Sequence, residues 1–431
     1  MVISGSGHPN VPKGSGSLGP LGDGQTAIII GGGPAGSSCA ITLKMMGKKL
    51  GRDINVIIYE GMKFNEDCIK RVGVLSPPLT ETLEEVLGVT FPCEVIQRKV
   101  AGYYLHSGDA KIKLNLGGRL SFVGHNVAID RYLLGKAKEL GVRVIPGRVK
   151  DIKFYPDGIA VESDLKGAKG ATKGDVLVGA FGLDAETANL LEQATPYVTP
   201  KALFSVVTKI PADPEYLKGC EDYLHVFLPT TLDDIEFGVV TPKLTDLIVN
   251  VAGPAVTEES LERFLSLPEV RELVPADVVR EDEKLVSRPL PIPLEPAQNS
   301  FGDRYVTVGD TSGLVRAYKG NGINSACETG IKAAEVMLKV GISHRALKEY
   351  HTAFSHIVKD LPYGRTVRQM TILGEKYGTM PGALRVAAKD GALVNVLIDF
   401  LSGSRTYREI LGDSGIVGLS LKFLRGATAA S

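Results

Sequence analysis

A short apolar segment followed by a run of glycines constrains the fold of this chain more than any other feature. Residues Thr26–Ile30 read TAIII, and Gly31–Gly36 then read GGGPAG. A continuous apolar run of this length is typical of a strand buried on both faces of a parallel sheet. Residues 37–50 have a helical pattern, and Ile54–Glu60 form a second apolar run. This order predicts a strand–helix–strand unit and therefore an α/β fold.

The spacing Gly31-x-Gly33-x-x-Gly36 suits a bound dinucleotide. The first glycine allows a tight turn, the second lets the backbone approach a pyrophosphate, and the third permits close packing of helix on strand. The N-terminal amides of the helix favour the anion. Glu60 ends the second apolar run, where its carboxylate can bind both hydroxyls of an adenosine ribose. An acid there favours FAD or NAD over NADP.

A second glycine-containing segment lies far downstream and separates FAD from NAD. Tyr305–Asp310 (YVTVGD) have the pattern of another buried strand, and Gly320–Asn324 (GNGIN) open a helix. Asp310 at the strand end can accept a hydrogen bond from a ribityl hydroxyl. A helix beginning near Gly322 would aim its amides at the flavin N1/O2 edge. An NAD dehydrogenase needs no such segment, so the pair of motifs predicts FAD; a strand–loop–helix without a ligand is the alternative.

Composition excludes several classes of protein. The net charge of +0 and the pI near 7.1 argue against a nucleic-acid partner. No apolar run is long enough to span a bilayer. The five cysteines are scattered without a CxxC pair, and no His, Asp or Glu cluster has ligand spacing, so we expect reduced thiols, no metal site and a cytoplasmic protein.

A chain of 431 residues is too long for one compact core. Alternating and proline-rich stretches predict an antiparallel sheet and, at Arg288–Pro296, a linker. We divide the chain into a flexible tail at 1–24, a discontinuous FAD-binding domain at 25–94, 125–190 and 286–344, a substrate domain at 95–124 and 191–285, and a helical region at 345–431.

Four segments occur in the order seen in FAD-dependent enzymes of the glutathione-reductase-like superfamily. They read TAIIIGGGPAGSSCAITL, IDRYLLGKAKELGVRV, LVGAFG and YVTVGDTSGLVRAYKGNGINSACETG. The sequence resembles the geranylgeranyl reductase family, with hydroxylases of the p-hydroxybenzoate hydroxylase type as more distant relatives. The resemblance implies a Rossmann-like FAD-binding domain, an inserted antiparallel-sheet substrate domain and a helical C-terminal region.

The resemblance also implies roles for single residues. Arg131 would contact the ribityl–pyrophosphate region, unless it is a surface arginine, and Val149, on the strand after that helix, would lie beside the adenine. The residues expected to bind FAD are Gly31, Gly33, Pro34, Ala35, Gly36, Glu60, Arg131, Val149, Gly309, Asp310, Gly320, Gly322, Ile323 and Asn324.

Departures from the family patterns bear on the reaction. The hydroxylases carry Asp-Gly where this chain has Phe181-Gly182, and a proline where it reads Arg316-Ala317-Tyr318-Lys319. Both departures favour a reductase. The prenyl reductases have a motif with a tryptophan in the substrate domain, and this chain contains no tryptophan, which leaves the substrate open.

The catalytic candidates are Cys68, in the loop after the second strand, and Arg316, Tyr318 and Lys319 beside the expected flavin pocket. A thiol or a cationic group there can donate a proton; an inert cysteine and solvated loop residues are the alternatives. The apolar stretch Ile416–Gly426 carries two basic residues and suits either a packed helix or weak contact with a membrane surface.

We therefore predict an FAD-dependent reductase or dehydrogenase that transfers hydride to or from an apolar, isoprenoid- or quinone-like small molecule. Its electron donor or acceptor would be NAD(P)H, ferredoxin or a quinone. A flavin monooxygenase is one alternative. A flavin electron-transfer protein without an organic substrate is another.

Overall fold

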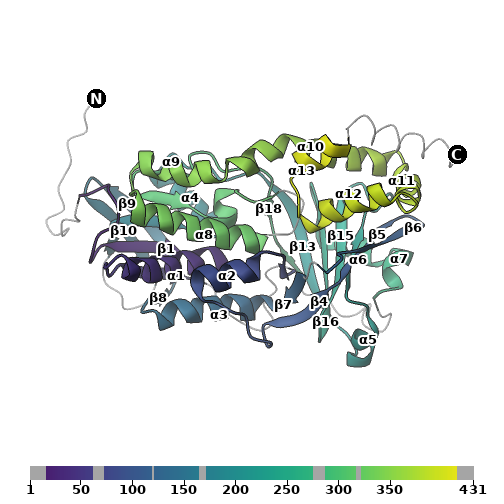
Figure 1. Cartoon of the computed structure of the whole chain (residues 1–431), viewed down its shortest axis with the longest axis horizontal. Coiled ribbons are helices and arrows are strands. Elements are labelled where there is room, and N and C mark those ends of the chain that lie inside the picture. Colours follow the sequence, from purple (N-terminus) through teal and green to yellow (C-terminus); the bar gives the residue numbers. More distant parts are fainter. Residues whose placement is uncertain are drawn as a thin grey trace.

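The computed structural model describes six stretches of the chain, shown in Figure 1: residues 16–61, 72–118, 121–164, 171–274, 287–316 and 322–414. Several predictions fall outside these stretches, namely those for Cys68, Tyr318, Lys319, Gly320 and Ile416–Gly426.

A six-stranded, mainly parallel sheet forms the part of the molecule that contains the glycine motif. Its strands are, in spatial order, β19 (Phe301–Gly302), β20 (Tyr305–Thr307), β12 (Val176–Gly179), β1 (Thr26–Ile30), β2 (Asn55–Glu60) and β8 (Arg143–Pro146). β1 lies between β2 and β12 and is parallel to both. Together with α1 (Pro34–Lys49), β1 and β2 form the predicted strand–helix–strand unit, which confirms the α/β fold.

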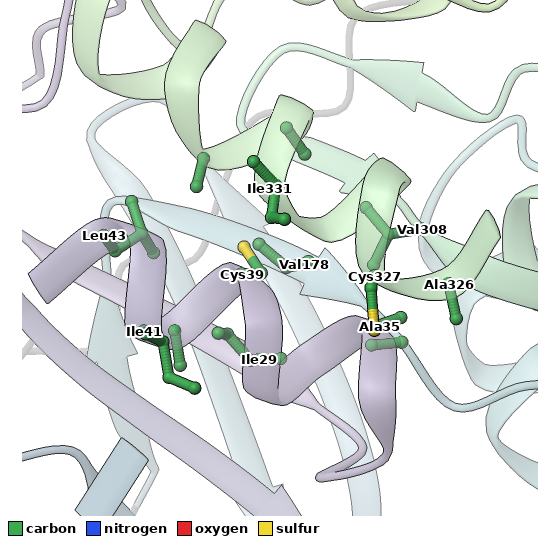
Figure 2. Close-up of a cluster of buried hydrophobic side chains, with 14 of the residues drawn as sticks. Ile29, Ala35, Cys39, Ile41, Leu43, Val178, Val308, Ala326, Cys327 and Ile331 are labelled. Carbon is green, nitrogen blue, oxygen red and sulfur yellow. The ribbon is translucent and has the colours of Figure 1, made fainter. Parts of the chain in front are cut away.

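Two helices pack against each other beside this sheet. Figure 2 shows Ala35 and Cys39 of α1 facing Cys327 and Ile331 of α8 (Gly322–Lys339). A Cβ atom added at Gly330 would lie 2.2 Å from the carbonyl oxygen of Ala35. The helices can approach this closely only because α8 has a glycine there. The close packing places the N-termini of both helices in the same part of the molecule.

An eight-stranded sheet forms the other half of the molecule. Its strands are β17 (Ser287–Pro289), β13 (Ala202–Pro211), β16 (Asp246–Gly253), β15 (Phe237–Pro242), β14 (Tyr223–Phe227), β5 (Gly102–Ser107) and β6 (Ala110–Asn115), with β18 (Ile292–Pro293) beside β13. Most pairs are antiparallel, as predicted, but β14 and β5 are parallel. The expected linker at Arg288–Pro296 is partly wrong, because β17 and β18 pair with β13 at the sheet edge, where proline is tolerated.

The two faces of the large sheet have different neighbours. Val206 and Leu247 belong to an apolar cluster with Phe264 of α6 (Glu258–Leu265). Val207 and Ile248 alternate with them and contact Val72 and Leu290. Side chains alternate between the faces of a strand. We call the face that carries Val207 the inner face, because it meets the segment that follows β2.

Two small sheets and the remaining helices complete the fold. The small sheets contain β3 (Val74–Leu75), β7 (Ser121–Gly124) and β4 (Ile96–Val100), and β11 (Thr172–Gly174), β10 (Gly158–Ser163) and β9 (Val149–Tyr155). The other helices are α2 (Leu79–Leu87), α3 (Asn126–Glu139), α4 (Ala185–Ala194), α5 (Pro214–Gly219) and α7 (Pro268–Arg271), with a short 3-10 helix η1 (Gly309–Ser312).

The C-terminal helices form a layer of their own. They are α9 (His344–Ala353), α10 (Ser355–Lys376), α11 (Met380–Ala387), α12 (Gly391–Ser402) and α13 (Tyr407–Ser414), and they confirm the predicted helical region. In Figure 1 α10 runs along the top of the molecule and α12 crosses the large sheet. Within the described stretches, no helix has both the length and the apolar character needed to cross a membrane.

Candidate functional site

The glycine loop after β1 owes its shape to close backbone contacts. Gly31 has a φ of 108°, in the left-handed region that favours glycine. A Cβ at Gly31 would lie 2.2 Å from the Ala180 carbonyl oxygen, and a Cβ at Gly36 would lie 2.0 Å from the Gly31 carbonyl oxygen. Any larger residue at either position would collide with the backbone.

Gly33 differs from these two glycines because its surroundings are open. Gly33 is the N-cap of α1, with a φ of −70°, and no side chain caps the helix there. A Cβ added at Gly33 would meet no atom within 4 Å. The fold therefore does not require glycine here, whereas a pyrophosphate approaching the helix amides would. This open cradle fits the predicted dinucleotide.

Glu60 lies beside the same loop, as the sequence predicted. Its Oε2 atom accepts a hydrogen bond of 2.7 Å from the backbone amide of Gly32. The hydroxyl of Ser37 donates to the Gly32 carbonyl oxygen at 2.9 Å. Sequence reasoning missed Gly32 and Ser37. The run of three glycines at Gly31–Gly33 was a signal that could have indicated Gly32. A serine inside a helix, such as Ser37, gives no comparable signal.

The second predicted motif contains Gly309 and Asp310, which lie beside the N-terminus of α8. Gly309 has a φ of 61°, and its amide donates to the Thr329 hydroxyl at 2.8 Å. A Cβ at Gly322 would lie 3.8 Å from Oδ1 of Asp310. The structure thus brings Asp310 and the first residue of α8 together. We call this region, Asp310 with Gly322–Asn324, the α8 mouth.

Asn324 takes part in holding the α8 mouth to the rest of the molecule. Its Nδ2 atom donates to the carbonyl oxygen of Ser76 at 2.6 Å, and its Oδ1 atom accepts from the Ser76 amide at 3.3 Å. Both polar atoms of the side chain therefore bind the segment that follows β3. Ser76 is a contact that no sequence signal indicated.

The two residues assigned by resemblance alone lie in different environments. Arg131 is an exposed residue of α3. Val149 is the first residue of β9 and not part of β8, the strand that directly follows α3, so its expected element was wrong. Val149 is buried with Tyr59 and Ile145 in an apolar cluster. Their contacts with FAD stay predictions.

The guanidinium of Arg316 makes hydrogen bonds and an ion pair with other residues of the chain. Its guanidinium donates to the carbonyl oxygens of Gly403 and Arg405, the latter at 2.8 Å. It also lies 3.9 Å from Oδ2 of Asp360. These partners belong to the C-terminal layer, so the described contacts give Arg316 an anchoring role. Among the residues that the structure describes, no group of three or more His, Cys, Asp or Glu could hold a metal.

Comparisons with known proteins agree with this geometry. Geranylgeranyl diphosphate reductase, chloroplastic, of Nicotiana tabacum is 24% identical over 329 residues, which cover 72% of this chain and 65% of that protein. Digeranylgeranylglycerophospholipid reductase of Methanococcus vannielii is 22% identical over 371 residues, which cover 79% of this chain and 86% of that protein. The match therefore spans slightly less than two thirds of the tobacco protein. No protein-family model matches the chain.

A solved structure shares the fold. The crystal structure of a geranylgeranyl bacteriochlorophyll reductase-like protein from Thermoplasma acidophilum superposes with a TM-score of 0.70 and 15% identity, covering 90% of this chain and 98% of that one. The reductase relatives and the open glycine cradle define an FAD-dependent oxidoreductase. Within that class the chain is similar to the geranylgeranyl reductases, at 22–24% identity to the two relatives above. The predicted resemblance and the FAD cofactor are confirmed.

Proposed function

We propose that the protein is a reductase or dehydrogenase that moves hydride between FAD and an apolar small molecule of isoprenoid or quinone type. One observation carries the apolar substrate. Val207 and Ile248 of the inner face meet Val72 and Leu290 in an apolar cluster, and Val72 belongs to the segment that follows β2 and Glu60. The sheet thus presents apolar side chains toward the part of the chain that would hold the cofactor.

Different residues of the chain would bind different parts of FAD. The amides at the start of α1 and the open position at Gly33 would receive the pyrophosphate, and Glu60 would bind the ribose hydroxyls. Asp310 would bind the ribityl chain, and the α8 mouth would direct its amides at the flavin edge. FAD, when bound, supplies the hydride chemistry. The apolar cluster around Val207 and Ile248 would exclude water from the reacting atoms.

Tyr318, Lys319 and Cys68 are the candidates for holding a proton near that site. The external electron donor or acceptor would be NAD(P)H, ferredoxin or a quinone. We place the protein in the cytoplasm, where weak contact with a membrane surface would give it access to a lipid-like substrate.

Reduction of the FAD-loaded protein under anaerobic conditions tests this proposal. We expect the oxidised flavin absorption to be bleached by dithionite or reduced ferredoxin, and to return when a prenyl alcohol or a short-chain quinone is added. Oxygen-dependent consumption of NADPH with formation of a hydroxylated product would identify a monooxygenase instead. Reoxidation by redox proteins but by no organic acceptor would identify an electron-transfer protein.

A further inference from the structure

Helix α10 carries a row of apolar side chains in contact with water. Met370, Leu373 and Tyr377 are spaced three and four residues apart, so they lie on one face of the helix. Their exposed fractions are 37%, 48% and 70%. Tyr377 directly follows Lys376, the last residue of α10, and is its C-cap. We call these three residues the α10 stripe.

The opposite face of α10 packs on the rest of the protein. Ile357, Leu361 and Gly364 of this face are buried. Further along the helix, the guanidinium of Arg368 binds the carboxylate of Glu236, with Nε and Oε2 2.7 Å apart. Glu236 directly precedes β15, so this pair fixes α10 to one end of the large sheet. These contacts hold the helix in place and leave the α10 stripe uncovered.

Exposed large apolar side chains elsewhere in the described stretches are scattered. Each of them lies in a different element or loop: Leu50, Val86, Leu140, Val198, Phe204 and Leu244. Single exposed apolar residues are normal on a protein surface. A contiguous row is different, because it indicates contact with a partner or a membrane. The α10 stripe is such a row.

The exposed charges of α10 are all positive. Lys359, Arg365 and Lys376 are exposed, whereas both acids of the helix, Asp360 and Glu375, are buried. The Arg365 guanidinium forms an ion pair with a residue outside the helix. The two lysines have no ion-pair partner among the residues that the structure describes. The outer surface of α10 therefore combines apolar side chains with unpaired cations.

The two lysines lie at the ends of the α10 stripe. Lys359 precedes Met370 by eleven residues, which is close to three helical turns, so it lies on the same face. Lys376 is next to Tyr377 at the edge of that face. The row from Lys359 to Tyr377 is about 27 Å long, at 1.5 Å per residue. This pattern, apolar side chains between lysines, is typical of a helix that lies on an anionic membrane surface.

A second copy of the chain does not suit this face. In a two-fold contact the same surface meets itself. The cations of one α10 would then lie against those of the other, and like charges at an interface oppose binding. The face requires a partner that offers negative charge and apolar contact side by side.

An anionic lipid surface has this chemistry. Lysine can lay its aliphatic stem along apolar surface while its ammonium reaches a charged headgroup. Tyrosine is enriched at the boundary between headgroups and acyl chains. Figure 1 shows α10 along the top of the molecule, at its edge. A helix in this position can enter a flat interface, whereas a protein partner would have to supply a matching groove.

We propose that the α10 stripe, with Lys359 and Lys376, docks the protein on an anionic lipid surface, with α10 lying in the plane of the interface. The inference deepens the proposed function and rests on it for the purpose of the contact, which is access to a lipid-like substrate. The contact itself rests on the exposed residues of α10. These are separate from the residues expected to bind FAD.

The absence of tryptophan from the chain allows a direct test. Tyr377→Trp gives the FAD-loaded protein one fluorophore on the stripe. With vesicles of mixed phosphatidylglycerol and phosphatidylcholine, we expect its emission to shift to the blue and saturate. Vesicles of phosphatidylcholine alone should require about tenfold more lipid. Leu244→Trp is the matched control and should not respond, because Leu244 is 57% exposed and follows β15, at the other end of that strand from Glu236.

Two further variants in the Tyr377→Trp background separate the apolar contact from the charge. Leu373→Glu should weaken binding to the anionic vesicles about tenfold. Lys359→Gln combined with Lys376→Gln should weaken it by a similar factor and remove the preference for anionic lipid. Leu244→Glu should change neither. FAD uptake and thermal unfolding should stay the same throughout, because all four positions are exposed.

Several outcomes would overturn the inference. They are an emission that ignores lipid, equal binding to neutral and anionic vesicles, and binding that Leu373→Glu does not affect. A blue shift that rises with protein concentration alone would show a second copy on α10. The same shift with soluble polyglutamate would assign the face to an acidic protein.

The two proposals can fail separately. Vesicle binding by a protein whose reduced flavin no prenyl alcohol or quinone reoxidises would leave the docking surface standing and overturn the reductase. Reoxidation by these acceptors without any vesicle binding would do the reverse.

Discussion

The cofactor side and the helical layer of this molecule are built in opposite ways. Around the glycine loop the backbone is so closely packed that a Cβ at Gly31 or Gly36 would lie within 2.2 Å of a carbonyl oxygen. On α12 most apolar side chains after Leu393 are only partly buried, although little of the helix is polar. The first arrangement fixes the shape of the glycine loop. The second leaves apolar side chains partly exposed.

This difference explains why the sequence predicts the cofactor and leaves the substrate open. A site made by backbone contacts leaves a glycine pattern in the sequence, whereas a site made by partly buried apolar side chains resembles any other apolar surface. Members of one fold can therefore keep the cofactor and change the substrate.

The largest expected effect tests the packing of the cofactor side. Gly36→Ala should destabilise the protein by about 3 kcal/mol, because the new methyl group would be forced against the Gly31 carbonyl oxygen. Gly135→Ala is the matched control, since a Cβ at this α3 position meets no atom within 4 Å. It should gain up to about 1 kcal/mol from helix propensity. Urea unfolding measures both, and equal stabilities would contradict the packing account.

The next effect separates folding from cofactor binding within the same loop. Gly33→Ala should cost the FAD-free protein no more than about 1 kcal/mol, because the position is open and the only loss is that alanine is a poorer N-cap than glycine. It should weaken FAD binding by about 100-fold, because the methyl group would take the place of the pyrophosphate. Flavin fluorescence titration measures the affinity. An unchanged affinity would move the pyrophosphate away from this loop.

The sequence predicted the cofactor side well for a physical reason. The spacing of Gly31, Gly33 and Gly36 is imposed by backbone geometry and by the ligand. Glu60 ends β2, and Asp310 lies in η1, three residues after the end of β20. Each of these features is local in the chain. The βαβ unit could therefore be predicted from adjacent residues alone.

The remaining features depend on contacts between distant residues. Arg316 was expected beside the flavin pocket as a possible proton donor, whereas its guanidinium binds the turn after α12, almost ninety positions away. The parallel pair of β14 and β5 and the edge strand β17 also join remote segments. Ser76 and Asn324 meet across 248 positions. No periodicity in the sequence records such pairings.

A buried carboxyl group in the helical layer, Glu375, makes the stability of the protein depend on pH. Glu375 of α10 is 8% exposed, its Oε1 atom has no hydrogen-bond partner among the described residues, and burial together with the nearby Glu236 carboxylate raises its pKa to about 8. The folded protein therefore holds a proton that the unfolded chain loses above pH 4.5. The contribution of Glu375 to stability falls as the pH rises from about 4.5 to 8.

Glu375→Gln should remove this dependence. The variant should exceed the native protein in stability by about 2 kcal/mol at pH 8, and the difference should shrink toward pH 5. Thermal unfolding at several pH values measures it, with Glu409→Gln as an exposed control. A difference that does not vary with pH would show that Glu375 is ionised in the folded protein.

The smallest effects compare two arginines of the C-terminal layer. Arg316→Met should cost about 1–2 kcal/mol, because two carbonyl oxygens lose their donor and the buried Asp360 carboxylate loses a positive charge 3.9 Å away. It should also speed hydrogen exchange at the start of α13, and Arg316→Lys should restore part of the protection.

Arg385→Met breaks an exposed ion pair with Asp109 and should cost no more than about 0.5 kcal/mol. If both substitutions cost the same and neither changes exchange at α13, Arg316 is a surface contact, and the helical layer is held over the sheet by its apolar side chains alone.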